Sequence, residues 1–222
     1  MRALGFLFDT ESGFGRLMTK IEIIFVSNLL FLLFCIPVIT VGASITALYR
    51  VMLKEFRSAS DINPFHEFWY GFRTNLKQAT ICWVIALALL FLGRMEIYWC
   101  SQFGDFFSYI EIALWSMGCM GLVILMYLFP AIAAFQNTIR NLVSNSICFI
   151  IKKPLVTVGV VLCNVIPMLI ISLDEVNRPM YAFLYFFGGF AFTAWINSWL
   201  LLKVFSQYLP KKDEVDTDIE VD

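Results

Sequence analysis

Charged residues are scarce in this chain. Asp, Glu, Lys and Arg make up 15% of its 222 residues and hydrophobic residues make up 60%, whereas a soluble domain usually has ~25% charged and ~45–50% apolar residues. The net charge of −1 supplies no long-range attraction for nucleic acid. We therefore exclude a soluble globular fold and a nucleic-acid partner.

Patterns typical of metal centres and active sites are also missing. There is one histidine, His66, and the six cysteines are irregularly spaced with no CxxC pair, whereas zinc sites need ligands at short characteristic spacings. The chain contains no HExxH, no GxxxxGK[ST] and no GxSxG motif. We therefore expect no metal, no cofactor and no catalytic residue, and we expect that the chain is not an enzyme.

Long apolar runs are what the chain has in abundance. A helix that crosses a bilayer needs ~20 mostly apolar residues, and four runs meet this length: residues 79–99, 110–129, 155–173 and 180–202. A fifth run, 21–48, is longer and contains Pro37 and Gly42. The runs are continuous, unlike the alternating strands of a membrane β-barrel. The sequence predicts an all-α, polytopic membrane helix bundle of about five transmembrane helices, forming a single domain over residues 1–210.

The first run allows two topologies. Either residues 21–48 cross the membrane once, or the run dips in and returns at Pro37 as a re-entrant hairpin, whose arms would be shorter than a span and whose turn must be buried in protein. With five spans, eleven lysine and arginine residues lie on one side, against Arg2, Arg16, Lys20, Arg94 and Arg178 on the other. Because basic residues favour the cytoplasm, we expect a cytoplasmic C-terminus and an outer N-terminus. The hairpin would place both termini in the cytoplasm.

Residues 64–77 form an amphipathic stretch just before the second span. Asn63 is suited to cap a helix and Pro64 to occupy its first position. A narrow apolar stripe is flanked by two basic residues, and the set comprises Phe65, Phe68, Trp69, Phe72, Arg73, Leu76 and Lys77. A basic, aromatic helix of this kind lies at the headgroup boundary or docks on a partner, so these residues are the candidate lipid or partner surface. A second amphipathic stretch covers 131–151.

Polar and helix-breaking residues inside the runs predict structural roles. Pro37 lacks a backbone donor, the Thr40 hydroxyl can bond a carbonyl one turn earlier, and Gly42 permits close approach of another helix. Together they predict a structural bend. Asn28 is one of several polar residues at mid-membrane depth whose hydrogen bonds hold helices together. The alternative is that the proline breaks line a substrate cavity, as in transporters.

The last residues differ in composition from the rest. Residues 211–222 contain two lysines followed by six acidic residues and few apolar ones. Such a segment cannot bury enough apolar surface to fold, so the sequence predicts a disordered acidic tail.

Several motifs together resemble the YesL-like family of bacterial integral membrane proteins. Asn28-Leu29-Leu30, then 37–43 and 47–49, are similar to its opening signature. Residues 75–80, Phe129-Pro130 with 135–138, and Asn197 with 200–205 resemble its later blocks in the same order. The resemblance adds Pro130 and Asn137 to the structural motif of Asn28, Pro37, Thr40 and Gly42. Gln136 stands where the family pattern has an acidic residue.

The resemblance also implies a location and a context. The family is a domain of unknown function, mainly in Gram-positive bacteria, whose genes often lie beside those for ABC-type carbohydrate importers, glycoside hydrolases and two-component regulators. It implies a multi-pass protein of the bacterial plasma membrane, with ABC transporter permease subunits as partners besides the lipid bilayer. The leading expectation is a non-enzymatic accessory subunit supporting ABC-type carbohydrate uptake. The alternatives are a small permease or channel and an intramembrane enzyme.

Overall fold

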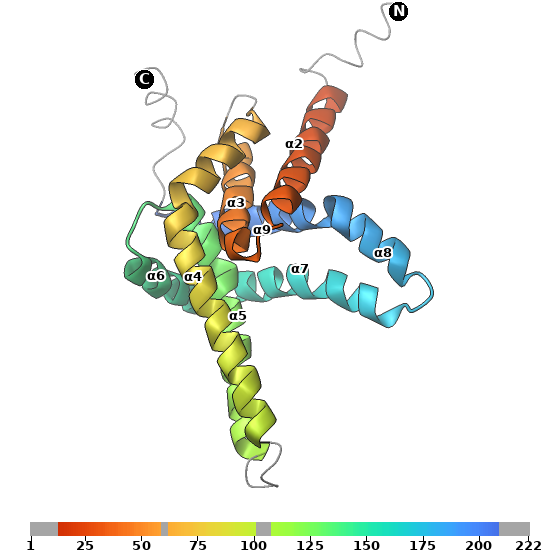
Figure 1. Cartoon of the computed structure of the whole chain (residues 1–222). Coiled ribbons are helices and arrows are strands. Elements are labelled where there is room, and N and C mark those ends of the chain that lie inside the picture. The colour runs from red at the N-terminus through yellow and green to blue at the C-terminus, as the bar shows by residue number, and fades with distance from the viewer. Residues whose placement is uncertain (1–12, 59–61, 101–107, 209–222) are drawn as a thin grey trace, which may run out of the picture.

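The computed structural model describes residues 13–58, 62–100 and 108–208, and these form helices and no strands (Figure 1). In chain order the elements are α2 (Gly13–Phe34), η1 (Val38–Thr40), α3 (Val41–Arg57), α4 (Pro64–Cys100), α5 (Ser108–Ala134), α6 (Ile139–Lys152), α7 (Pro154–Leu173), α8 (Arg178–Leu184), η3 (Tyr185–Gly189) and α9 (Phe190–Phe205). Five of the helical stretches are long and apolar enough to cross a membrane. The predicted all-α, polytopic membrane fold is confirmed.

The predicted single span over residues 21–48 is wrong, because the chain breaks in the middle of this run. Helix α2 ends at Phe34, and α3 begins at Val41 and runs back alongside it (Figure 1). Pro37 has an extended backbone, with φ −76° and ψ 113°, and it has no N–H to continue the helix. The Thr40 hydroxyl lies 2.7 Å from the Phe34 carbonyl oxygen and 2.8 Å from that of Pro37. The predicted bend therefore becomes a full reversal, and α2 alone is long enough to span.

Helix α3 is the centre of the molecule. Ten of its 17 residues are buried, and it packs against α2, α4, α5 and α9. A Cβ added at Gly42 would lie 2.6 Å from the Trp83 Cβ and 2.7 Å from the Ala79 carbonyl oxygen on α4. The Trp83 indole also donates a 2.7 Å hydrogen bond to the carbonyl of Val38 in the turn. The close helix approach predicted at Gly42 is therefore confirmed.

Helix α4 contains both the amphipathic stretch 64–77 and the apolar run 79–99 in one continuous helix of 37 residues. The first stretch is therefore not a separate helix. Beyond α3, α4 and α5 run side by side as a long hairpin that projects away from the other helices (Figure 1). The second amphipathic stretch also differs from expectation, because residues 131–134 complete α5 and α6 begins at Ile139.

The final span is a helix with a π-helical insertion. Helices α8 and α9 are joined by η3, whose bonding pattern is π-helical. The Asn28 side chain on α2 donates a 2.8 Å hydrogen bond to the Phe186 carbonyl and accepts a 3.1 Å bond from the Ala191 amide. Residues five apart are the pair that a π-helix joins, so Asn28 bridges this pair from outside the helix. This contact confirms that Asn28 ties two helices together.

Candidate functional site

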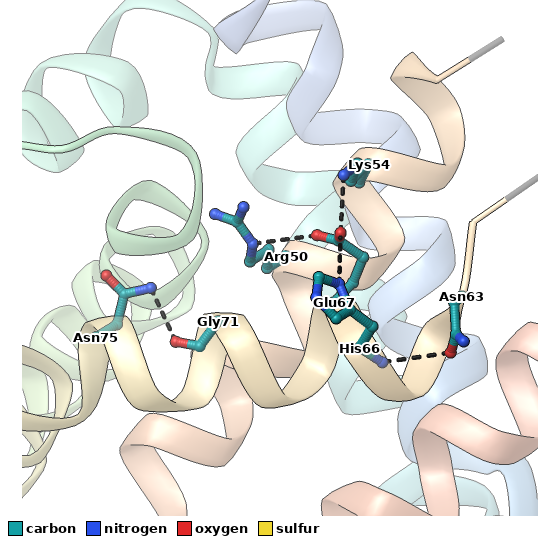
Figure 2. Close-up of polar contacts among 7 residues, drawn as sticks. All are labelled: Arg50, Lys54, Asn63, His66, Glu67, Gly71 and Asn75. Carbon is teal, nitrogen blue, oxygen red and sulfur yellow. Dashed lines mark hydrogen bonds and ion pairs between the residues drawn. The ribbon is translucent and has the colours of Figure 1, made fainter. Parts of the chain in front are cut away.

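The candidate site lies where the first turns of α4 pack on the last turns of α3 (Figure 2). Asn63 starts α4 as predicted, because its side-chain oxygen accepts hydrogen bonds from the amides of Phe65 at 3.1 Å and His66 at 3.3 Å. Pro64 follows at the first helical position, where its missing N–H costs nothing. The cap therefore determines where the aromatic face of α4 begins.

Glu67 anchors this part of α4 to α3. Its side chain is 9% exposed; the Lys54 ammonium lies 2.8 Å from one carboxylate oxygen and the Arg50 Nε lies 3.4 Å from the other. Figure 2 shows the carboxylate between these two cations, with the His66 ring beside it at 3.5 Å. Arg50 and Lys54 are four residues apart and so project from the same side of α3. One buried acid therefore neutralises part of a basic face.

Glu67 is a site residue that the sequence prediction missed. It lies off the apolar stripe of α4, so the helical pattern places it on a solvent-facing side. The available signal was the pair of basic residues Arg50 and Lys54, spaced one turn apart on the helix that immediately precedes Glu67 in the chain. Only the packing of α3 on α4 turns that spacing into an ion-pair site.

The predicted surface stripe of α4 is divided by the fold. Phe68 and Phe72 are buried, with ring centroids 5.6 and 4.7 Å from that of Phe34 at the end of α2. Leu76 is partly buried against the same core. By contrast, Phe65 is 60% exposed and Trp69 is 45% exposed. The prediction of one continuous surface is therefore wrong, because the α2–α3 hairpin covers part of the stripe.

The exposed side of α4 carries a shallow hollow. Its volume is about 460 Å³, and it is lined by His66, Trp69, Tyr70, Arg73 and Thr74. The Arg50 guanidinium lies over the Tyr70 ring, 4.5 Å from its centroid. Lys77 is also exposed, one turn beyond Arg73, but does not line the hollow. Of the predicted surface residues, the fold thus brings Trp69 and Arg73 together with neighbours that the stripe did not include.

A second ion pair connects α2 to the C-terminal end of α3. The Lys20 ammonium on α2 lies 3.4 Å from the Glu55 carboxylate, which also accepts a 3.2 Å hydrogen bond from the Trp195 indole. The expected topology put Lys20 and Arg50 on opposite sides of the membrane. In the structure, however, Lys20 contacts Glu55, which lies little more than one turn beyond Arg50 on α3.

The remaining predicted motif residues make structural contacts away from the hollow. Asn137 lies between α5 and α6, where its carbonyl accepts a 2.7 Å hydrogen bond from Gln78 of α4 and its side chain accepts a 2.9 Å bond from Asn141. Pro130 is fully buried inside α5. No group of three or more potential metal ligands occurs within the described residues. The acidic tail, 211–222, lies outside them.

Comparison with protein families gives a match to part of the chain. A family model described as "Protein of unknown function, DUF624" matches residues 24–96. This region covers the second half of α2, the reversal at Pro37, the whole of α3 and most of α4, so it includes the Glu67 anchor and the exposed hollow. No curated protein and no solved structure matches the chain. The chain therefore resembles an uncharacterised family in the region that builds the site.

Proposed function

We propose that this chain is a YesL-like, non-enzymatic accessory subunit of the bacterial plasma membrane that supports ABC-type carbohydrate uptake. Five apolar helices fit a multi-pass membrane protein. The match over residues 24–96 to a family of unknown function agrees with the resemblance of the Asn28, Pro37 and Gly42 motifs. The carbohydrate context comes from that resemblance alone.

One observation carries the docking role. Phe65 and Trp69 are large aromatic side chains that the chain leaves exposed on α4, while Glu67 on the same helix is anchored to α3. A helix that is already held in place loses little conformational entropy when a partner covers it. Exposed tryptophan on such a helix is the residue type most often found as a binding hot spot. A membrane partner seated on this edge of α4 would cover both aromatic side chains.

The orientation that we propose follows from the α2–α3 hairpin. If α2 and α3 enter and leave on the same side, both ends of the chain lie in the cytoplasm. Of the lysine and arginine residues that the structure describes, Arg94 and Arg178 are then the two that lie outside. This distribution agrees with the positive-inside rule better than a single first crossing does. The aromatic edge of α4 then faces the cytoplasmic boundary of the bilayer.

The proposal is tested by purification of the tagged chain from native membranes under mild detergent, followed by mass spectrometry. We expect ABC transporter permease subunits to co-purify in near-stoichiometric amounts. An unrelated membrane protein that carries the same tag serves as the control for non-specific recovery. Recovery of the chain with no permease subunit above that control contradicts the proposal.

A small permease is the second candidate, and buried polar groups favour it. The Asn197 amide donates a 3.2 Å hydrogen bond to the Tyr49 hydroxyl in the interior. The side-chain oxygens of Ser27, Asn197 and Ser198 are buried without a hydrogen-bond partner in the described part of the chain. Such groups suit a water-filled path. Uptake of sugar into liposomes that contain only this chain, abolished by Asn197→Leu, would select this candidate over the accessory role.

A further inference from the structure

The groups that line the hollow on α4 share the capacity to donate hydrogen bonds, although the His66 ring already lies 3.5 Å from the Glu67 carboxylate. His66, Trp69, Tyr70, Arg73 and Thr74 surround about 460 Å³ of space. The indole and the guanidinium are hydrogen-bond donors only, and the imidazole and the two hydroxyls can donate. Among the described residues, no carboxylate lines the hollow. Such a set of donors, with no acid among the described lining residues, fits a negatively charged group better than a cation.

The nearest acid on α4 is already engaged. The Glu67 carboxylate is turned toward α3 and is held by Lys54 and Arg50 at 2.8 and 3.4 Å, so it does not neutralise Arg73. Two cations against this single acid leave a surplus of positive charge beside the hollow. The Arg50 guanidinium over the Tyr70 ring brings part of that charge to the wall of the hollow. The local electrostatic potential therefore attracts anions.

We propose that this hollow binds a phosphate group, with the Arg73 guanidinium as its charged contact. The planar fork of arginine matches the oxygens of a phosphate in a bidentate manner. The hydroxyls of Tyr70 and Thr74 supply neutral donors, and the Trp69 ring forms an apolar wall of the kind that lies at a membrane interface. The phosphate comes either from the headgroup of an anionic phospholipid or from a free anion in solution. The site requires no protein partner and goes beyond the proposed accessory function.

Native mass spectrometry of the full-length chain in mild detergent tests this site. The chain is titrated with phosphatidylglycerol, and in a separate series with inorganic phosphate. Arg73→Gln is compared with Lys77→Gln, because both residues are exposed on the same helix one turn apart, and both substitutions remove one positive charge. Of the two, only Arg73 lines the hollow. Thermal unfolding of each variant checks that it remains folded.

We expect Arg73→Gln to weaken binding about tenfold, the scale of one lost charge-assisted contact, and Lys77→Gln to leave it nearly unchanged. Phosphatidylglycerol binding that excess inorganic phosphate does not displace identifies a lipid headgroup. Displacement by inorganic phosphate, or binding of phosphate alone, identifies a free anion. Both results support the site. Equal weakening by the two substitutions indicates diffuse surface charge and overturns the proposal, as does unchanged binding by Arg73→Gln.

Discussion

The side chain of Asn28 completes the backbone hydrogen bonding around Phe186, 158 residues away in the chain. Its amide donates to the Phe186 carbonyl at 2.8 Å, and its oxygen accepts from the Ala191 amide at 3.1 Å. Asn28 is fully buried, and unpaired backbone groups are costly in such surroundings. Helix α2 therefore stabilises the π-helical insertion η3 in the final span.

Asn28→Ala is expected to destabilise the fold. It leaves one carbonyl and one amide of the final span without partners, at a cost of about 1–3 kcal/mol for each group. The melting temperature in detergent measures this loss. Asn164→Ala is the matched control, because the Asn164 amide bonds only to the Val160 carbonyl of its own helix in the described structure. If the two variants have the same melting temperature, Asn28 does not stabilise the π-helical segment.

Glu67→Gln is expected to loosen the contact between α3 and α4. Arg50 and Lys54 would then face each other without an acid, and because both remain partly exposed the cost is about 1–3 kcal/mol. The stability should recover when Lys54→Met is added. Glu175→Gln removes an ion pair whose acid is 86% exposed and should have no measurable effect. Equal melting temperatures for Glu67→Gln and Glu175→Gln would show that Glu67 is no anchor.

Gly42→Ala is expected to lower the yield of folded protein. The added methyl group would meet the Ala79 carbonyl oxygen at 2.7 Å, and this backbone atom cannot move without shifting α4. Gly118→Ala is the control, because nothing lies within 4 Å of the corresponding position on α5. Monodisperse yield by size-exclusion chromatography distinguishes them. Similar yields from both variants would mean that the α3–α4 approach tolerates a wider spacing.

The hairpin topology predicts which residues share a side of the membrane. In a cysteine-free background, Phe14→Cys and Ser206→Cys should react with an impermeant thiol reagent only after the cell is opened. Val176→Cys, which is 87% exposed between α7 and α8, should react in intact cells. Labelling of Phe14→Cys in intact cells would contradict the hairpin topology and support an outer N-terminus.

Local features of the fold could be predicted from the sequence. Apolar runs of about 20 residues suffice to indicate spanning helices, and the cap at Asn63 and the close approach at Gly42 depend on single residues and their immediate neighbours. The Glu67 anchor and the splitting of the α4 stripe could not be predicted, because they depend on how α2 and α3 pack on α4. The π-helical segment has no local pattern either, since its stabilising amide comes from Asn28 on another helix.

The central claim is that the exposed edge of α4 docks a membrane partner. The most direct measurement compares quantitative recovery of co-purifying permease subunits by Trp69→Ala and by Trp115→Ala. Both tryptophans are about half exposed, at 45% and 51%, but Trp115 lies on the projecting part of α5. Loss of a hot-spot tryptophan costs ~2 kcal/mol or more, equivalent to roughly 30-fold weaker binding. The account predicts that Trp69→Ala loses the partner while Trp115→Ala retains it, with expression and membrane insertion of both unchanged. Full partner recovery by Trp69→Ala would contradict it.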